Sequence, residues 1–106
     1  MTACQCPDYD HEQTPAEVLD YASDFARYLP SGSGIASVSA SVVAGTGTVG
    51  TGAHGPSFEG TVAKAYLSEV ELGADVVLQI VIVSDDTPPL TLSDEHTIRP
   101  VAKHTD

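Results

Sequence analysis

The feature that most constrains the fold is an apolar run of eight residues, Val76–Val83, which reads VVLQIVIV. Most of these residues are β-branched, which favours an extended strand over a helix. Gly73 precedes the run, and the turn sequence SDDTPP follows it. Proline cannot lie inside a hydrogen-bonded ladder, so the strand must end before this turn. The run therefore predicts a central strand.

Other segments alternate between apolar and polar residues, as half-buried strands do. They cover residues 18–23, 36–42 and 62–67, and a last strand is expected over residues 90–101. Pro100 is expected to place the end of that last strand at a sheet edge. Short strands separated by turn signals, without a convincing amphipathic helix, predict an all-β sandwich.

The stretch DYASDFARYL holds three of the six aromatic residues in the chain. Asp24 is expected to cap a single short helical turn over residues 25–29, which Pro30 stops. Because most inward positions elsewhere are Ala or Val, we expect these aromatic side chains to fill one open end of the sandwich. The predicted core consists of Tyr21, Phe25, Tyr28, Leu67, Leu78, Ile80 and Ile82.

The charge balance restricts the class of partner. Four Lys and Arg residues stand against fifteen Asp and Glu residues, for a net charge of −11. This excess argues against nucleic acid or an anionic membrane as the principal partner and favours a protein surface. Residues 31–58 carry no Lys, Arg, Asp or Glu at all. Within them, Ser37, Ser39 and Ser41 form either a solvated strand face or a flat polar surface for a neighbouring subunit, and both interpretations stay open.

Residues 1–15 have little apolar content and predict an extended N-terminal arm before a sandwich of residues 16–101 and a tail of residues 102–106. We expect the arm, with Cys4, Cys6 and Tyr9, to contact a neighbouring subunit. Cys4, Cys6 and His11 could also bind Zn²⁺ if an acidic residue such as Asp8 completed the site. A C-x-C pair is a weaker signal than paired C-x-x-C motifs, so no metal or cofactor is expected.

Motifs of common enzyme classes are absent from the sequence. There is no G-x-S-x-G nucleophile motif, no phosphate-binding P-loop and no H-E-x-x-H zinc motif. The glycine-rich stretch GTGTVGTGAHG lacks a lysine and a following helix, so a flexible loop is expected there. The four histidines are dispersed along the chain, which indicates ordinary surface positions. The sequence therefore predicts a protein that is not an enzyme.

An ordered set of segments resembles the small immunoglobulin-like structural proteins of tailed bacteriophages, of the fiber-tail adaptor type. The segments are PAEVLDYASDFARYL, GIASVSASVVAG, GTVAKAYLS, GADVVLQIVIVSDD and SDEHTIRPV, and the resemblance covers residues 14–101. It implies an immunoglobulin-like β-sandwich that serves as a virion component, made in the host cytoplasm and assembled at the neck or tail. The implied partners are other virion proteins and further copies of the chain in a ring or array.

Two alternatives remain at this point. A capsid decoration protein would share the fold and the acidity but would bind the shell of the particle. A small metal-binding module would use Cys4, Cys6 and His11 as its ligands.

Overall fold

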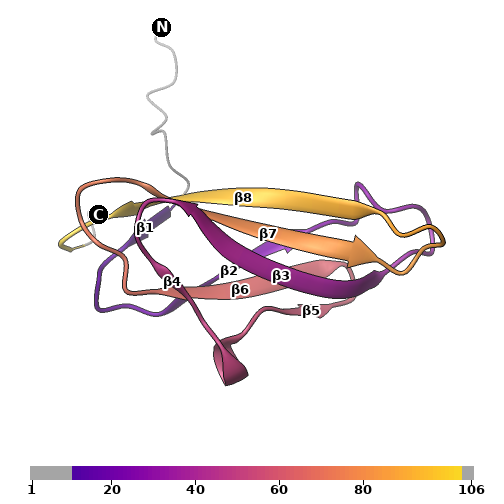
Figure 1. The fold of residues 1–106 in the computed structure, drawn as a ribbon, viewed down its shortest axis with the longest axis horizontal. Coiled ribbons are helices and arrows are strands. Elements are labelled where there is room, and N and C mark those ends of the chain that lie inside the picture. The colour runs from indigo at the N-terminus through magenta and orange to yellow at the C-terminus, as the bar shows by residue number, and fades with distance from the viewer. Residues whose placement is uncertain (1–10, 104–106) are drawn as a thin grey trace, which may run out of the picture.

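The computed structural model describes residues 11–103, which form two facing β-sheets (Figure 1). The first sheet has the order β1-β8-β7-β3, and the second has the order β2-β6-β4, with β5 also paired to β6. The strands are β1 (His11–Gln13), β2 (Leu19–Asp24), β3 (Ile35–Ala44), β4 (Thr48–Val49), β5 (Ser57–Glu59), β6 (Val62–Ser68), β7 (Val76–Ser84) and β8 (Thr91–Pro100). This architecture confirms the predicted all-β class. No helix of residues 11–103 is long and apolar enough to cross a membrane.

The core lies between the two sheets and is centred on β7, which pairs with β8 on one side and β3 on the other. The alternation predicted for β6 is present, since Ala63, Ala65 and Leu67 point inward and are fully buried. Along β7, every second side chain also enters the core. The buried residues of the predicted core set are Tyr21, Phe25, Leu67, Leu78, Ile80 and Ile82.

Tyr28, which was expected in the core, is exposed: 64% of its surface remains accessible. Residues 25–29 form one hydrogen-bonded turn, in which the carbonyl of Phe25 accepts from the amides of both Tyr28 and Leu29. As predicted, a carboxylate oxygen of Asp24 accepts a hydrogen bond at the start of this turn, from the amide of Ala26 at 2.9 Å. Residues four apart lie on the same side of such a turn. Leu29 therefore joins Phe25 against the core, and Tyr28 points outward.

Residues 11–13, which were predicted to belong to the extended arm, form a strand of the sandwich. Strand β1 pairs in parallel with β8, with His11 opposite Ile98 and Gln13 opposite Pro100. Gln13 is fully buried, so residues 11–13 belong to the sandwich. A single buried polar residue in a polar stretch gives no periodic signal, which is why sequence reasoning missed this strand.

β8 is an inner strand, in contrast to the sheet edge expected from Pro100. Proline is tolerated here because it is the last residue of β8, beyond the end of the pairing with β7 at Ile98. The next residue supplies the missing donor, since the Val101 amide donates to the Gln13 carbonyl at 3.0 Å. The end of β8 is thereby held against β1.

The glycine-rich stretch carries the chain from the first sheet to the second. It contains β4 and a 3-10 helix, Gly52–His54, where only a loop was expected. Gly45 stands at the crossover with a positive φ of 78°, and a Cβ there would lie 2.4 Å from the carbonyl oxygen of Asp75. Only glycine fits this close approach. The crossover leaves β3 as an outer strand of the first sheet.

Candidate functional site

Most of the outer face of the first sheet is formed by the outward side chains of β3, β7 and β8, and β1 continues it with Glu12, which pairs with Arg99. Pairing places Ser37 opposite Val83, Ser39 opposite Val81 and Ser41 opposite Gln79. Residues of β8 continue the face on the other side of β7. We call this surface the serine–valine face: Ser37, Ser39, Ser41, Val77, Gln79, Val81, Val83, Thr91, Ser93, Glu95, Thr97 and Arg99.

β3 gives this face an open edge. Within residues 11–103 its only strand partner is β7. Ser37, Ser39 and Ser41 are all exposed, and their hydroxyls make no hydrogen bond within the described residues. An exposed edge strand presents unpaired amides and carbonyls that another chain can pair with. Natural sheet edges are commonly protected by charged residues, proline or β-bulges. β3 contains no charged residue and no proline, and its two irregularities lie near its ends, between Ile35 and Ser37 and between Val42 and Ala44.

The serine–valine face carries little charge although the chain is strongly acidic. Glu95 and Arg99 are its charged members, and the Arg99 guanidinium is 2.7 Å from the carboxylate of Asp75. The outer face of the second sheet differs, since Asp20 and Asp24 of β2 are exposed there. Covering a charged face costs desolvation energy that covering Ser, Thr and Val side chains largely avoids. Of the two outer faces, the serine–valine face is therefore the one that another protein can cover with the smaller loss of desolvation energy.

A buried polar link joins the two sheets at the edge formed by β1 and β2. The Tyr21 hydroxyl donates to Gln13 Oε1 at 2.8 Å, and Gln13 Nε2 donates to the Leu67 carbonyl at 2.7 Å. The same nitrogen also donates to the Glu17 carbonyl at 3.0 Å. Each buried polar atom of the Gln13 side chain thus has a partner, which offsets the cost of burying it.

Stability at alkaline pH should depend on Tyr21. Burial raises the pKa of Tyr21 from 10.0 to about 12, and the carboxylates of Glu17 and Asp20 add to the increase. The folded chain then holds this proton more tightly than the unfolded chain does. The resulting stability is fully present below pH 10 and is lost as pH rises toward 12. We expect the wild-type chain to lose more free energy of unfolding over this interval than Tyr21→Phe. Denaturant titrations at several pH values measure the loss, and parallel curves for the two proteins would refute the assignment.

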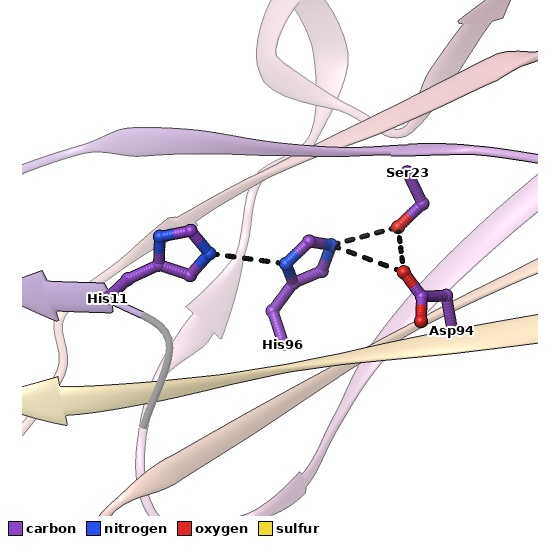
Figure 2. Close-up of polar contacts among 4 residues, drawn as sticks. All are labelled: His11, Ser23, Asp94 and His96. Carbon is purple, nitrogen blue, oxygen red and sulfur yellow. Dashed lines mark hydrogen bonds and ion pairs between the residues drawn. The ribbon is translucent and has the colours of Figure 1, made fainter. Parts of the chain in front are cut away.

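A second polar group at the same edge contains His11, Ser23, Asp94 and His96 (Figure 2). Ser23 Oγ donates to Asp94 Oδ2 at 2.7 Å and lies 2.8 Å from His96 Nε2. His96 Nδ1 lies 3.3 Å from His11 Nε2. With the Ser23 proton directed to Asp94, the neutral tautomer of His96 that satisfies both of its contacts donates through Nε2 and accepts at Nδ1. The four side chains therefore form a chain of hydrogen bonds from β1 through β8 to β2.

This group contains a serine, a histidine and an aspartate, but not in the order that activates a nucleophile. An activated serine gives its proton to the imidazole, and the carboxylate orients the opposite ring nitrogen. Here the Ser23 hydroxyl and the Asp94 carboxylate both lie on the Nε2 side of His96, and Ser23 donates to Asp94. The arrangement links the two sheets, because His11 and His96 belong to the first sheet and Ser23 to the second.

The structure brings together some predicted site residues and leaves others unplaced. Ser37, Ser39 and Ser41 share one exposed face, as expected. His11 of β1 lies beside His96 of β8. From the sequence, the histidines were expected at separate surface positions. Their separation of 85 positions in the sequence gave no signal of this contact. Cys4, Cys6 and Tyr9 lie outside the described residues.

One known protein family matches most of the chain. Residues 13–98 match the family model described as "Podophage GP4 fiber-tail adaptor protein gp77". No curated protein matches the chain. The matched range begins at Gln13 in β1 and ends at Ile98 in β8, so it includes every strand of both sheets in whole or in part.

Proposed function

The chain belongs to the podophage fiber-tail adaptor family, and we propose that it is a non-enzymatic structural protein of the virion that links other virion proteins at the neck or tail. Membership of the family supports the adaptor role. In the group of Figure 2, Ser23 donates to Asp94, and both side chains lie on the Nε2 side of His96, an order that differs from that of a nucleophilic triad. In this proposal the chain is made in the host cytoplasm and acts after incorporation into the particle.

The serine–valine face is the surface through which we expect neighbouring copies of the chain to contact each other. It is broad, nearly uncharged and continuous with the open edge of β3. Two copies of a chain with a net charge of −11 repel each other over most of their surfaces. Copies in a ring can approach most closely where the charge is lowest, which is along β3. We propose that this face and edge contact the neighbouring copy, and that other surfaces contact the fiber or tail protein.

We also propose that the sandwich is immunoglobulin-like. In that fold one sheet contains strands ABED and the other contains CFG. The order β2-β6-β4 corresponds to strands B, E and D, and the order β8-β7-β3 corresponds to G, F and C. Strand β1, parallel to β8, would then be a first strand that has joined the CFG sheet.

A charge placed on β3 should block assembly. Ser39→Glu puts a carboxylate in the middle of the proposed contact, where burial leaves it unpaired. Even a cost of about 1.4 kcal/mol per contact weakens binding tenfold. We expect at least a tenfold lower content of the variant chain in particles grown on host cells that supply it in place of the wild-type chain. Quantitative mass spectrometry of purified particles measures this content.

Ala22→Glu is the matched control, because Ala22 is an exposed strand residue on the outer face of the other sheet. Both variants should keep the wild-type midpoint of unfolding. Incorporation of Ser39→Glu at the level of Ala22→Glu would contradict the proposed contact through β3. A defect in both variants would instead indicate contacts through both faces.

A further inference from the structure

The sequence of β3 reads the same in both directions around Ala40. Residues 38–42 are Val, Ser, Ala, Ser and Val. This stretch lies between the two irregularities of β3, so all five residues pair in regular register with β7. The two serines are exposed on the outer side of the sheet, and the two valines and Ala40 pack against the core as half-buried residues. A symmetric pattern of this kind suits pairing with an identical strand.

An antiparallel pair of β3 strands can place this pattern on a two-fold axis. With the axis through Ala40 of both copies, Ser39 lies opposite Ser41 of the second copy. Val38 then lies opposite Val42 of the second copy. Directly opposite side chains of antiparallel strands share one face of the sheet. Serine hydroxyls would therefore meet on the outer face, where they can hydrogen-bond to each other, and valine side chains would meet on the inner face.

The backbone of β3 is open to this pairing. Within residues 11–103, β7 is its one strand partner, and β3 runs along the outside of β7 (Figure 1). The contact would bring no like charges together, because β3 carries none. β2 is also an edge strand, but it exposes Asp20 and Asp24, and like charges on paired strands are destabilising. Of these two edges, β3 is therefore the one that suits pairing with itself.

The side of the sandwich beside β3 also exposes apolar surface. Val43 follows the symmetric stretch and is exposed. β5 lies beside β3, and its Phe58 is exposed as well. Exposed apolar side chains that lie together commonly mark a contact with another protein. A second copy against β3 would cover part of this surface and the exposed parts of the half-buried valines.

We propose that β3 pairs in antiparallel orientation with β3 of a second copy, with Ala40 of both copies at the two-fold axis. The inference rests on the proposed contact through β3 and adds its symmetry and its register. The two four-stranded sheets then form one continuous sheet in the order β1-β8-β7-β3-β3-β7-β8-β1. A two-fold pair closes on itself. Contacts that join one pair to the next in the particle therefore use other surfaces, including the serine–valine face.

Disulfide crosslinking tests the register. The full chain carries Cys4→Ser and Cys6→Ser, so that an introduced cysteine is its only thiol. Directly opposite Cα atoms are about 4.5–5.5 Å apart in antiparallel strands, within the range of about 4.4–6.8 Å that a disulfide bridges. Isotope-labelled Ser39→Cys chains mixed with unlabelled Ser41→Cys chains should therefore crosslink mainly into mixed dimers, which mass spectrometry identifies. Ala22→Cys is the matched control, because Ala22 is exposed on the second sheet, and it should stay uncrosslinked.

Sedimentation of the same cysteine-free chain tests the pairing itself and should show a dimer. Ser39→Glu should raise the dissociation constant at least tenfold, because both copies then carry a carboxylate beside the axis. Ala22→Glu should leave the dissociation constant unchanged. A monomeric chain without specific crosslinks would overturn the proposal. Crosslinking of Ser39→Cys with itself as efficiently as with Ser41→Cys would overturn the register. Incorporation into particles is measured separately, so a monomer that still enters particles would overturn the pairing and leave the adaptor role standing.

Discussion

Phe25→Ala is expected to lower the free energy of unfolding by about 3–5 kcal/mol, the usual cost of deleting a buried aromatic side chain. Phe25 is 2% exposed and belongs to the core cluster, together with Ala63 and Ala65 of β6. Alanine side chains in the core cannot extend to fill a space that a deleted ring leaves. Denaturant unfolding of the isolated chain measures the loss.

Tyr28→Ala is the matched control from the same turn, because 64% of Tyr28 is exposed. Its effect on unfolding should stay within about 0.5 kcal/mol, as for most surface substitutions. Equal effects of the two substitutions would contradict the placement of Phe25 inside and Tyr28 outside. An unchanged midpoint for Phe25→Ala, combined with lost incorporation into particles, would mean that Phe25 is a docking residue.

A second large loss of stability is expected when the three residues of β1 are deleted. Deleting residues 1–13 removes the parallel partner of β8 and leaves the Tyr21 hydroxyl and the Leu67 carbonyl without Gln13. Each buried polar group that loses its partner costs about 1–3 kcal/mol. We expect this deletion to cost about 2–6 kcal/mol in the free energy of unfolding.

Deleting residues 1–10 is the matched control, because it keeps β1 and the hydrogen bonds of Gln13. Both truncated chains and the full chain are compared in denaturant with a chelator present, so that any bound metal does not contribute. The shorter deletion should unfold close to the full chain. If both deletions unfold alike, β1 does not contribute to the sandwich as the structure indicates.

Elements with a strong local pattern could be predicted from the sequence. The run Val76–Val83 became the inner strand β7, and the alternation around Leu67 became β6 with the predicted residues inside. These predictions succeeded because successive side chains of a strand point to opposite faces, so the positions of the apolar residues in the sequence show which side chains are buried. The same holds for the exposed serines of β3. The family resemblance read from short motifs agrees with the match over residues 13–98.

Features that depend on contacts between distant residues could not be predicted. β1 exists because Gln13 finds Tyr21 and Leu67 as partners, and no local pattern in HEQ indicates this. Tyr28 and Leu29 lie on the same turn, and only the packing of the folded chain decides that Leu29 contacts the core while Tyr28 points outward. The pairing of His11 with His96 likewise follows from the parallel register of β1 and β8. Sequence spacing alone treats these two histidines as unrelated.

The most direct test of the proposed function is an electron-microscopy map of the phage particle at a resolution that shows strands. The proposal predicts that the chain lies at the neck or tail, with β3 and the serine–valine face covered by a neighbouring copy and the outer face of β2 and β6 turned away from that contact. A map in which the serine–valine face is open to solvent, or in which the chain lies on the capsid shell, would contradict it.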